Sequence, residues 1–193
     1  MPRPSLLLSC SLAAALAGGL TLESSGRALA QSRDPLTAVR GPGPAPSWKN
    51  TNWLNAETPL TLESLRGRVV LLNFWVFTCG NCTRTVPSLV DFDRKYRDRG
   101  LTLIGIHTPE FPPYGGEHDR ENVARALKEY EIGYANAQDN DSRTWGLYGI
   151  RYWPSFVLID KRGVVRYEGH GEFHLNSGSY KAWDRRIREL LAE

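Results

Sequence analysis

A near-continuous apolar run, VVLLNFWVF at residues 69–77, limits what this chain can fold into more than any other stretch. Nine uncharged residues, rich in β-branched and aromatic types, predict a strand that is buried on both faces. Strands of this kind lie in the centre of a sheet that helices cover on both sides. The composition agrees with a soluble globular domain, since 41% of the residues are hydrophobic and 23% are charged.

The residues after this run alternate between helix and strand patterns. Apolar residues spaced three and four apart follow residue 82 until Gly100, which predicts a helix, and LTLIGI at residues 101–106 predicts a second buried strand. A strand–helix–strand unit pairs its strands in parallel through a right-handed crossover. The remaining pattern predicts a turn-rich loop, two helices, a hairpin and a closing helix, at residues 107–119, 120–130, 142–148, 155–167 and 183–191.

The first 50 residues differ from the rest of the chain. Residues 5–22 carry no charge and are rich in Leu and Ala, and an Ala-x-Ala motif ends at Ala30. This arrangement is typical of a secretory signal peptide at residues 1–30 that is cleaved after Ala30, with an uncleaved membrane tether as the alternative. Residues 31–50 are rich in Pro and Gly, which predicts a linker before a domain at residues 51–193. We therefore expect an exported, periplasmic protein.

The charge distribution argues against one class of partner. The formal net charge is +3, and the basic residues are scattered along the chain rather than gathered in one run. A mildly basic, solvated surface accounts for this pattern, so no nucleic-acid partner is expected.

Two cysteines, Cys79 and Cys82, follow the apolar run directly. Removal of the leader would also remove Cys10, which leaves this pair as the thiols of the mature chain. A structural zinc site needs about four protein ligands, and the sequence offers no second cysteine pair. A disulfide across two intervening residues closes too small a loop to stabilise the fold much. The pattern therefore favours a redox centre.

The position of the CxxC suits thiol–disulfide exchange. At a strand end and helix start, the first sulfur lies near unpaired backbone N–H groups, where the helix dipole favours a thiolate. Gly80 and Asn81 are small and compatible with a helix start, which leaves that sulfur accessible. We expect Cys79 to attack a substrate disulfide and Cys82 to resolve the mixed disulfide, with no cofactor and no metal.

The stretch LLNFWVFTCGNCTRTVP at residues 71–87 resembles the thioredoxin superfamily and, within it, the exported TlpA/ResA-like group. It is most similar to the thioredoxin-like domain of DipZ-type proteins, as are GIHTPEF at 105–111 and GHGEF at 169–173. Pro87 stands where thioredoxins carry a helix-kinking proline. The resemblance covers about residues 50–193.

The resemblance implies a thioredoxin-like α/β fold, with a central mixed β-sheet flanked by helices. It also implies an N-terminal β extension and a TlpA-type insertion after the βαβ unit. Trp153-Pro154 matches the family's cis-proline loop, which presents backbone to the substrate. We expect the substrate-positioning residues to be Trp75, Gly80, Asn81, Trp153 and Pro154, although a core position is an equal alternative for Trp75.

One departure from the family concerns proton transfer. Thioredoxins carry a buried aspartate six residues before the first cysteine, and here that position is Asn73, which takes no proton at neutral pH. ResA-like proteins place a glutamate three residues after the second cysteine, and here that residue is Thr85. The general acid or base is therefore unassigned, with four alternatives: His107, Glu110, Glu168 and Glu172.

The resemblance to TlpA-type proteins implies reduction of disulfides in client proteins, with a disulfide oxidase or isomerase as the alternative. An exported reductant needs recharging in an oxidising compartment, which implies a membrane electron donor of the DsbD type. An alternative of another class is a Sco-like copper-binding module, in which His170 or His174 would join the cysteines.

Overall fold

The computed structural model describes residues 43–110 and 114–193, together with the backbone of Thr37–Ala38. The predicted signal peptide at residues 1–30 and the first part of the predicted linker lie outside these residues.

The described strands form one mixed sheet in the order β1-β7-β6-β3-β4-β5-β2. The central strand β3 pairs in parallel with β4 and antiparallel with β6, and β4 pairs in parallel with β5. The strands are Thr37–Ala38 (β1), Trp53–Leu54 (β2), Val69–Trp75 (β3), Leu101–His107 (β4), Ala135–Gln138 (β5), Ser155–Ile159 (β6) and Val165–His170 (β7).

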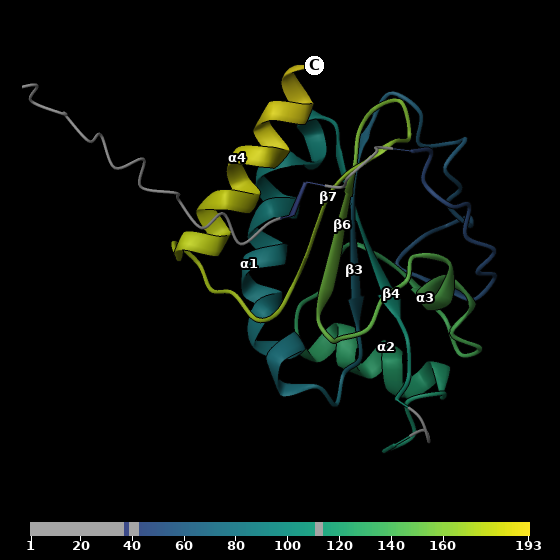
Figure 1. Ribbon diagram of the computed structural model, residues 1–193. Helices are drawn as coiled ribbons and strands as arrows, with labels where there is room; N and C mark the ends of the chain where they lie inside the picture. Colours follow the sequence, from purple (N-terminus) through teal and green to yellow (C-terminus); the bar gives the residue numbers. More distant parts are fainter. Residues whose placement is uncertain (1–36, 39–42, 111–113) are drawn as a thin grey trace, which may run out of the picture. The chain divides into compact units, whose positions relative to one another are not determined.

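The helices cover both faces of this sheet. The long helices α1 and α4 lie on one face, and the short helix α3 lies on the other (Figure 1). A 3₁₀ turn, η1, follows α1 and is capped by Gly100, whose φ of 104° suits a residue without a side chain. The helices are Gly80–Tyr96 (α1), Arg97–Arg99 (η1), Arg120–Glu129 (α2), Arg143–Leu147 (α3) and Gly178–Ala192 (α4).

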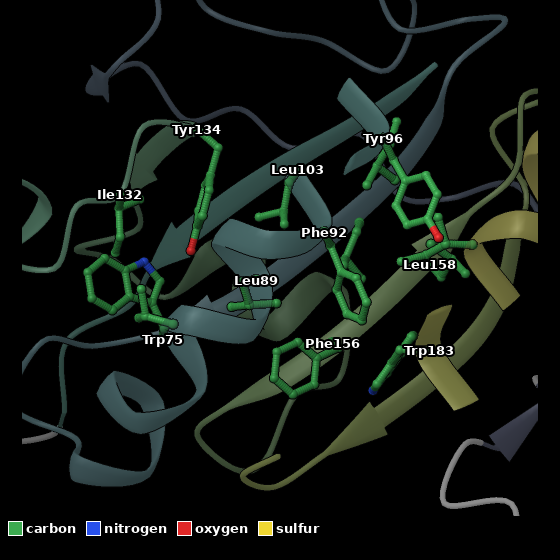
Figure 2. Close-up of a cluster of buried hydrophobic side chains, with 14 of the residues drawn as sticks. Trp75, Leu89, Phe92, Tyr96, Leu103, Ile132, Tyr134, Phe156, Leu158 and Trp183 are labelled. Carbon is green, nitrogen blue, oxygen red and sulfur yellow. The ribbon is translucent and has the colours of Figure 1, made fainter. Parts of the chain in front are cut away.

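Alternate residues of β3 enter two hydrophobic cores, as the pleat of a strand requires. Leu71 and Trp75 belong to the core between the sheet and α1, α2 and α4, part of which is shown in Figure 2. Leu72 and Phe74 belong to the opposite core, which residues 45–65 and α3 cover. Every residue of β3 is buried, as the apolar run predicts.

The thioredoxin-like fold, the central strand and the parallel β3–α1–β4 unit are confirmed. The central strand ends at Trp75 instead of residue 77, because the chain turns there toward α1. The closing helix begins at Gly178, five residues before the predicted start, where the Ser177 hydroxyl accepts a hydrogen bond from the Tyr180 N–H at 3.1 Å. The strand β5 was not predicted, since its sequence ANAQ lacks an apolar pattern.

The end of the predicted linker lies against the sheet. Ala45 and Trp48 are buried in the second core, and the Ala45 N–H donates to the Gly163 carbonyl at 2.9 Å. Pro44 forms an antiparallel bridge with Val164. Packed structure therefore begins ahead of residue 51 in the described part of the chain.

Within the described residues, no helix combines the length and the apolar character needed to cross a bilayer.

Candidate functional site

Cys79 caps the N-terminus of α1. The chain leaves β3 at Trp75 and turns so that the Cys79 N–H donates to the Val76 carbonyl at 3.2 Å. Cys79 keeps an extended backbone, and its sulfur accepts a hydrogen bond from the Cys82 N–H at 3.3 Å. The first sulfur of the CxxC therefore takes the place of a capping oxygen, among the free N–H groups of a helix start.

This environment lowers the pKa of Cys79 to about 7. The largest cause is a hydrogen bond from the Cys82 thiol, which outweighs partial burial. Backbone N–H groups of Cys82 and Asn81 lower the pKa further, while the negative charge of Glu110 opposes them. Near neutral pH the half-buried Cys79 is therefore present in large part as a thiolate.

Cys82 differs from its neighbour in every respect that governs reactivity. Its side chain is only 2% exposed, and both cysteines are free thiols in this structure. Burial strongly raises the pKa of Cys82, and the hydrogen bond to Cys79 and the charge of Cys79 raise it further. The site thus pairs one accessible, ionisable thiol with one that is buried and protonated.

The two residues between the cysteines, Gly80 and Asn81, are exposed. Both lie beside Arg84, which sequence analysis did not single out. The Arg84 guanidinium donates to the Asn81 side-chain oxygen at 2.5 Å and forms a two-pronged ion pair with Glu172, at 2.9 and 2.7 Å. A Cβ on Gly80 would lie 3.0 Å from Arg84 Nη1. Gly80 and Asn81 are therefore accessible, but one side of them is covered by Arg84.

The Trp153–Pro154 peptide bond is cis, as the resemblance implies. Trp153 is half-buried, and its indole N–H donates to the Thr108 carbonyl at 3.1 Å. Trp153 and Cys79 both pack against the core that contains Cys82. Pro154 itself is buried and lies directly before β6.

Trp75 takes the core position of its two alternatives. Its side chain is fully buried, its indole N–H donates to Asn136 Oδ1 at 2.9 Å, and its ring meets the His107 ring edge-on. A ring without exposed surface does not contact a substrate directly. Trp75 is instead part of the buried cluster against which Cys79 packs.

Two buried side chains, one from the last residue of β4 and one from the loop that follows, hold the turn before Cys79. His107 Nε2 accepts from the Phe77 N–H at 3.3 Å, and the Phe77 and His107 rings are stacked. Glu117, which is fully buried, accepts from the Thr78 hydroxyl and from the Glu110 N–H, the latter at 2.7 Å. Sequence analysis missed Glu117, because a carboxylate in a turn-rich segment normally lies in solvent.

The four alternatives for the missing acid or base occupy different environments. Burial lowers the pKa of His107 to about 3, which keeps its ring neutral. Glu172 is held by Arg84, and Glu168 is exposed on β7. Glu110 is exposed and acts electrostatically on both thiols. Of the four, only Glu110 combines access to solvent with an effect on the cysteines.

Asn73 lies in β3 beneath α1 and is 1% exposed. Its side-chain oxygen accepts no hydrogen bond. The structure thus places an uncharged amide where thioredoxins keep a carboxylate.

The two histidines of the copper alternative are engaged elsewhere. The His170 ring lies against Tyr152, with 5.2 Å between ring centroids, and His174 contacts Glu172 at 2.8 Å. Within the described residues, no group of three or more His, Cys, Asp or Glu side chains is arranged to hold a metal ion.

Comparison with known proteins gives a consistent result. The sequence profile of the AhpC/TSA family matches residues 43–168. Protein DipZ of Mycobacterium tuberculosis is 40% identical over 166 residues, which are 84% of this chain and 23% of DipZ. Thiol-disulfide oxidoreductase YkuV of Bacillus subtilis is 27% identical over 142 residues, which are 73% of this chain and 88% of YkuV. The chain therefore spans about a quarter of the length of the DipZ proteins that it matches.

Among solved structures, the thioredoxin-like superfamily protein SPOA0173 matches with a TM-score of 0.67 and 25% identity. The match covers 78% of this chain and 97% of that protein.

Proposed function

Because the chain belongs to the AhpC/TSA family of thioredoxin-like proteins, we propose that it is an exported thiol–disulfide oxidoreductase with its redox centre at Cys79 and Cys82. The observation that supports this most is the difference between the two thiols. Cys79 is accessible with a pKa of about 7, and Cys82 is buried with a strongly raised pKa.

The order of the steps follows from this difference. The Cys79 thiolate attacks one sulfur of a client disulfide, and the client's other sulfur leaves as a thiolate. Cys82 then loses its proton and attacks the Cys79 sulfur, which forms the Cys79–Cys82 disulfide and releases the second client sulfur. The client gains two electrons and two protons, and the CxxC is oxidised. Gly80, Asn81 and the loop at Trp153 and Pro154 would contact the client around the attacking sulfur.

The direction we propose is reduction of client disulfides. A strongly oxidising CxxC depends on a very stable thiolate in its reduced form, with a pKa far below neutrality. The pKa of about 7 at Cys79 corresponds to a moderate stabilisation, which is typical of reducing thioredoxins. An oxidase would require a reduction potential close to the oxidising end of the family's range. Measurement of the potential against glutathione separates the two directions.

Export and recharging belong to the same proposal. Export is supported by the leader pattern that ends at Ala30. A reductant outside the cytoplasm needs a supply of electrons across the membrane, so we propose a DsbD-type membrane donor as a partner.

Trapping tests the proposal. In Cys82→Ala the mixed disulfide cannot be resolved, so covalent complexes with client proteins should accumulate and disappear on treatment with dithiothreitol. Cys79→Ala is the matched control, because it keeps the second cysteine of the CxxC, in α1, but removes the attacking sulfur. Equal trapping by both variants, or by neither, would refute the assignment of nucleophile and resolving thiol.

A further inference from the structure

The Arg84 guanidinium lies against the two exposed residues of the CxxC. Its Nη2 donates to Asn81 Oδ1 at 2.5 Å, and its Nη1 lies 3.0 Å from the position that a Cβ on Gly80 would take. Gly80 directly follows the attacking Cys79, and Gly80 and Asn81 are both exposed. A positive charge therefore stands at the edge of the surface on which Cys79 meets a disulfide.

An ion pair fixes this charge in place. Glu172 accepts from Arg84 Nε at 2.9 Å and from Nη2 at 2.7 Å, so the planar guanidinium is held by two parallel contacts. The residue before Glu172 is anchored as well, because the Gly171 N–H donates to the Pro154 carbonyl at 2.9 Å. Arg84 thus joins α1 to the segment after β7 that is bonded to the cis-proline, and these are the two segments expected to flank a client.

The ion pair leaves one end of the guanidinium unused. Arg84 Nη1 donates to no acceptor among the residues that the structure describes. The Arg84 side chain is 56% exposed and that of Glu172 is 21% exposed, so the cation is the part of the pair that solvent reaches more easily. A guanidinium keeps its N–H groups in fixed directions and binds carboxylate oxygens well.

The guanidinium also interacts with the charge of the attacking sulfur. The hydrogen bond to Glu172 is the largest cause that raises the pKa of Arg84, and the negative charges of Glu172 and of Cys79 raise it further. A negative group that a client brings to Cys79 would therefore enter the same positive field.

Given the proposed CxxC chemistry, we propose that Arg84 is a specificity-determining residue that favours disulfides with a carboxylate beside the attacked sulfur. Its Nη1 donates a hydrogen bond to that carboxylate while the Cys79 thiolate attacks. The bond between the two client sulfurs breaks, a disulfide forms between Cys79 and one of them, and the other leaves as a thiolate that takes a proton from solvent. Arg84 binds the client and transfers neither proton nor electron.

Three small disulfides of different charge test this selectivity. Glutathione disulfide is anionic and carries carboxylates, bis(2-hydroxyethyl) disulfide is neutral, and cystamine is cationic. Each reduced protein carries Cys10→Ser and is mixed with one disulfide, quenched with acid and alkylated, and mass spectrometry then follows the formation of the Cys79–Cys82 disulfide. The rate constants for the two charged reagents are divided by that for the neutral reagent on the same protein. A change in the thiolate fraction of Cys79 affects all three rate constants equally, so it cancels in these ratios.

Arg84→Gln should change the two ratios in opposite directions. The ratio for glutathione disulfide should fall by about three- to tenfold, because an exposed charge-assisted hydrogen bond is lost, and the ratio for cystamine should rise. In the wild type the preference for glutathione disulfide should shrink at high salt, which screens exposed charges. Arg84→Lys keeps the positive charge, so its ratios should lie between those of the wild type and Arg84→Gln.

Arg97→Gln is the matched control. Arg97 directly follows α1, at the end away from the CxxC, pairs with Asp93 and has a side chain that is 53% exposed. Its replacement changes the net charge as much as Arg84→Gln does, but far along the helix from Cys79. Both ratios should therefore stay within about twofold of the wild-type values.

The outcomes separate this inference from the proposed function. A wild-type protein that forms no Cys79–Cys82 disulfide with any of the three reagents would refute the proposed function itself. A reactive wild type with unchanged ratios in Arg84→Gln would refute the role of Arg84 alone, and so would an equal slowing with all three reagents. Equal changes in Arg97→Gln would show that net charge, rather than the position of Arg84, sets the preference. Ratios in Arg84→Lys equal to those in Arg84→Gln would contradict a role of the positive charge.

Discussion

Replacement of Cys82 by alanine should raise the pKa of Cys79. The thiol of Cys82 is the largest of the influences that lower this pKa, and alanine removes it. The backbone N–H groups of Cys82 and Asn81 remain, so part of the stabilisation persists. A hydrogen bond to a charged group contributes about 1.5–3 kcal/mol, and one pH unit corresponds to about 1.4 kcal/mol, so the midpoint should rise by about one to two pH units.

The consequence for reactivity follows directly. With a pKa of about 7, half of the Cys79 population is ionised at neutral pH. After a rise of one pH unit the ionised fraction at pH 7 falls to about one tenth, and alkylation by iodoacetamide slows about fivefold. The rate is followed against pH by mass spectrometry of the peptide that contains Cys79. In the wild type the buried Cys82 does not interfere, because its pKa is strongly raised.

Cys82→Ser supplies the control. A serine hydroxyl also donates a hydrogen bond and has nearly the size of the thiol, so the midpoint of Cys79 should stay closer to the wild-type value than in Cys82→Ala. A Cys82→Ala midpoint still near 7 would show that the N-terminus of α1 alone lowers the pKa. Equal midpoints in the two variants would show that a hydrogen-bond donor at residue 82 does not lower the pKa of Cys79.

Three further changes test other parts of the molecule. Glu110→Gln removes a negative charge that raises the pKa of Cys79, so its alkylation midpoint should fall, and the difference should shrink at high salt; an unchanged or higher midpoint would contradict this. Gly105→Ala places a Cβ 1.9 Å from Asn136 Oδ1 and should lower the free energy of unfolding in urea by about 2–4 kcal/mol, whereas a loss below about 1 kcal/mol would mean that the strands adjust freely. Burial raises the pKa of Asp160, but hydrogen bonds from Val164, Arg166 and Arg162 outweigh this and lower it overall, so its stabilising effect is present above pH 4 and is lost as the pH falls through the folded value. Asp160→Asn should therefore reduce the free energy of unfolding by about 1–3 kcal/mol at pH 7 and by much less at about pH 3, and an equal reduction at both pH values would contradict the sign.

The parts of the fold that could be predicted depend on local patterns. The apolar run before Cys79 predicts β3 because a strand buried on both faces has no polar side to show. Helical spacing after Cys82 predicts α1, and the position between the two elements predicts a thiol at a helix N-terminus. The cis bond at Trp153–Pro154 followed from family resemblance, since composition alone gives a cis state a low frequency.

The strand β5 shows why other parts could not be predicted. Its sequence has two polar side chains, Asn136 and Gln138, which are both buried. The side-chain oxygen of Asn136 accepts a hydrogen bond from the Trp75 indole, and the side-chain oxygen of Gln138 accepts one from the side chain of Asn52. These partners lie more than 60 residues away in the sequence, so no window along the chain reveals that the polar atoms are satisfied. The same contacts make Trp75 a core residue rather than a rim residue.

The turn before Cys79 depends both on the local sequence pattern and on contacts with residues distant in the sequence. A helix N-terminus lowers the pKa of a thiol only if the sulfur lies among the free N–H groups, which requires a fixed path through Phe77 and Thr78. That path is held from a different part of the chain, by His107 on the Phe77 N–H and by Glu117 on the Thr78 hydroxyl. Glu117 also holds the Glu110 N–H, so the loop that fixes the turn carries the charge that acts on both thiols. The local sequence therefore supplies the reactive sulfur, whereas the distant loop fixes its geometry and adjusts its charge.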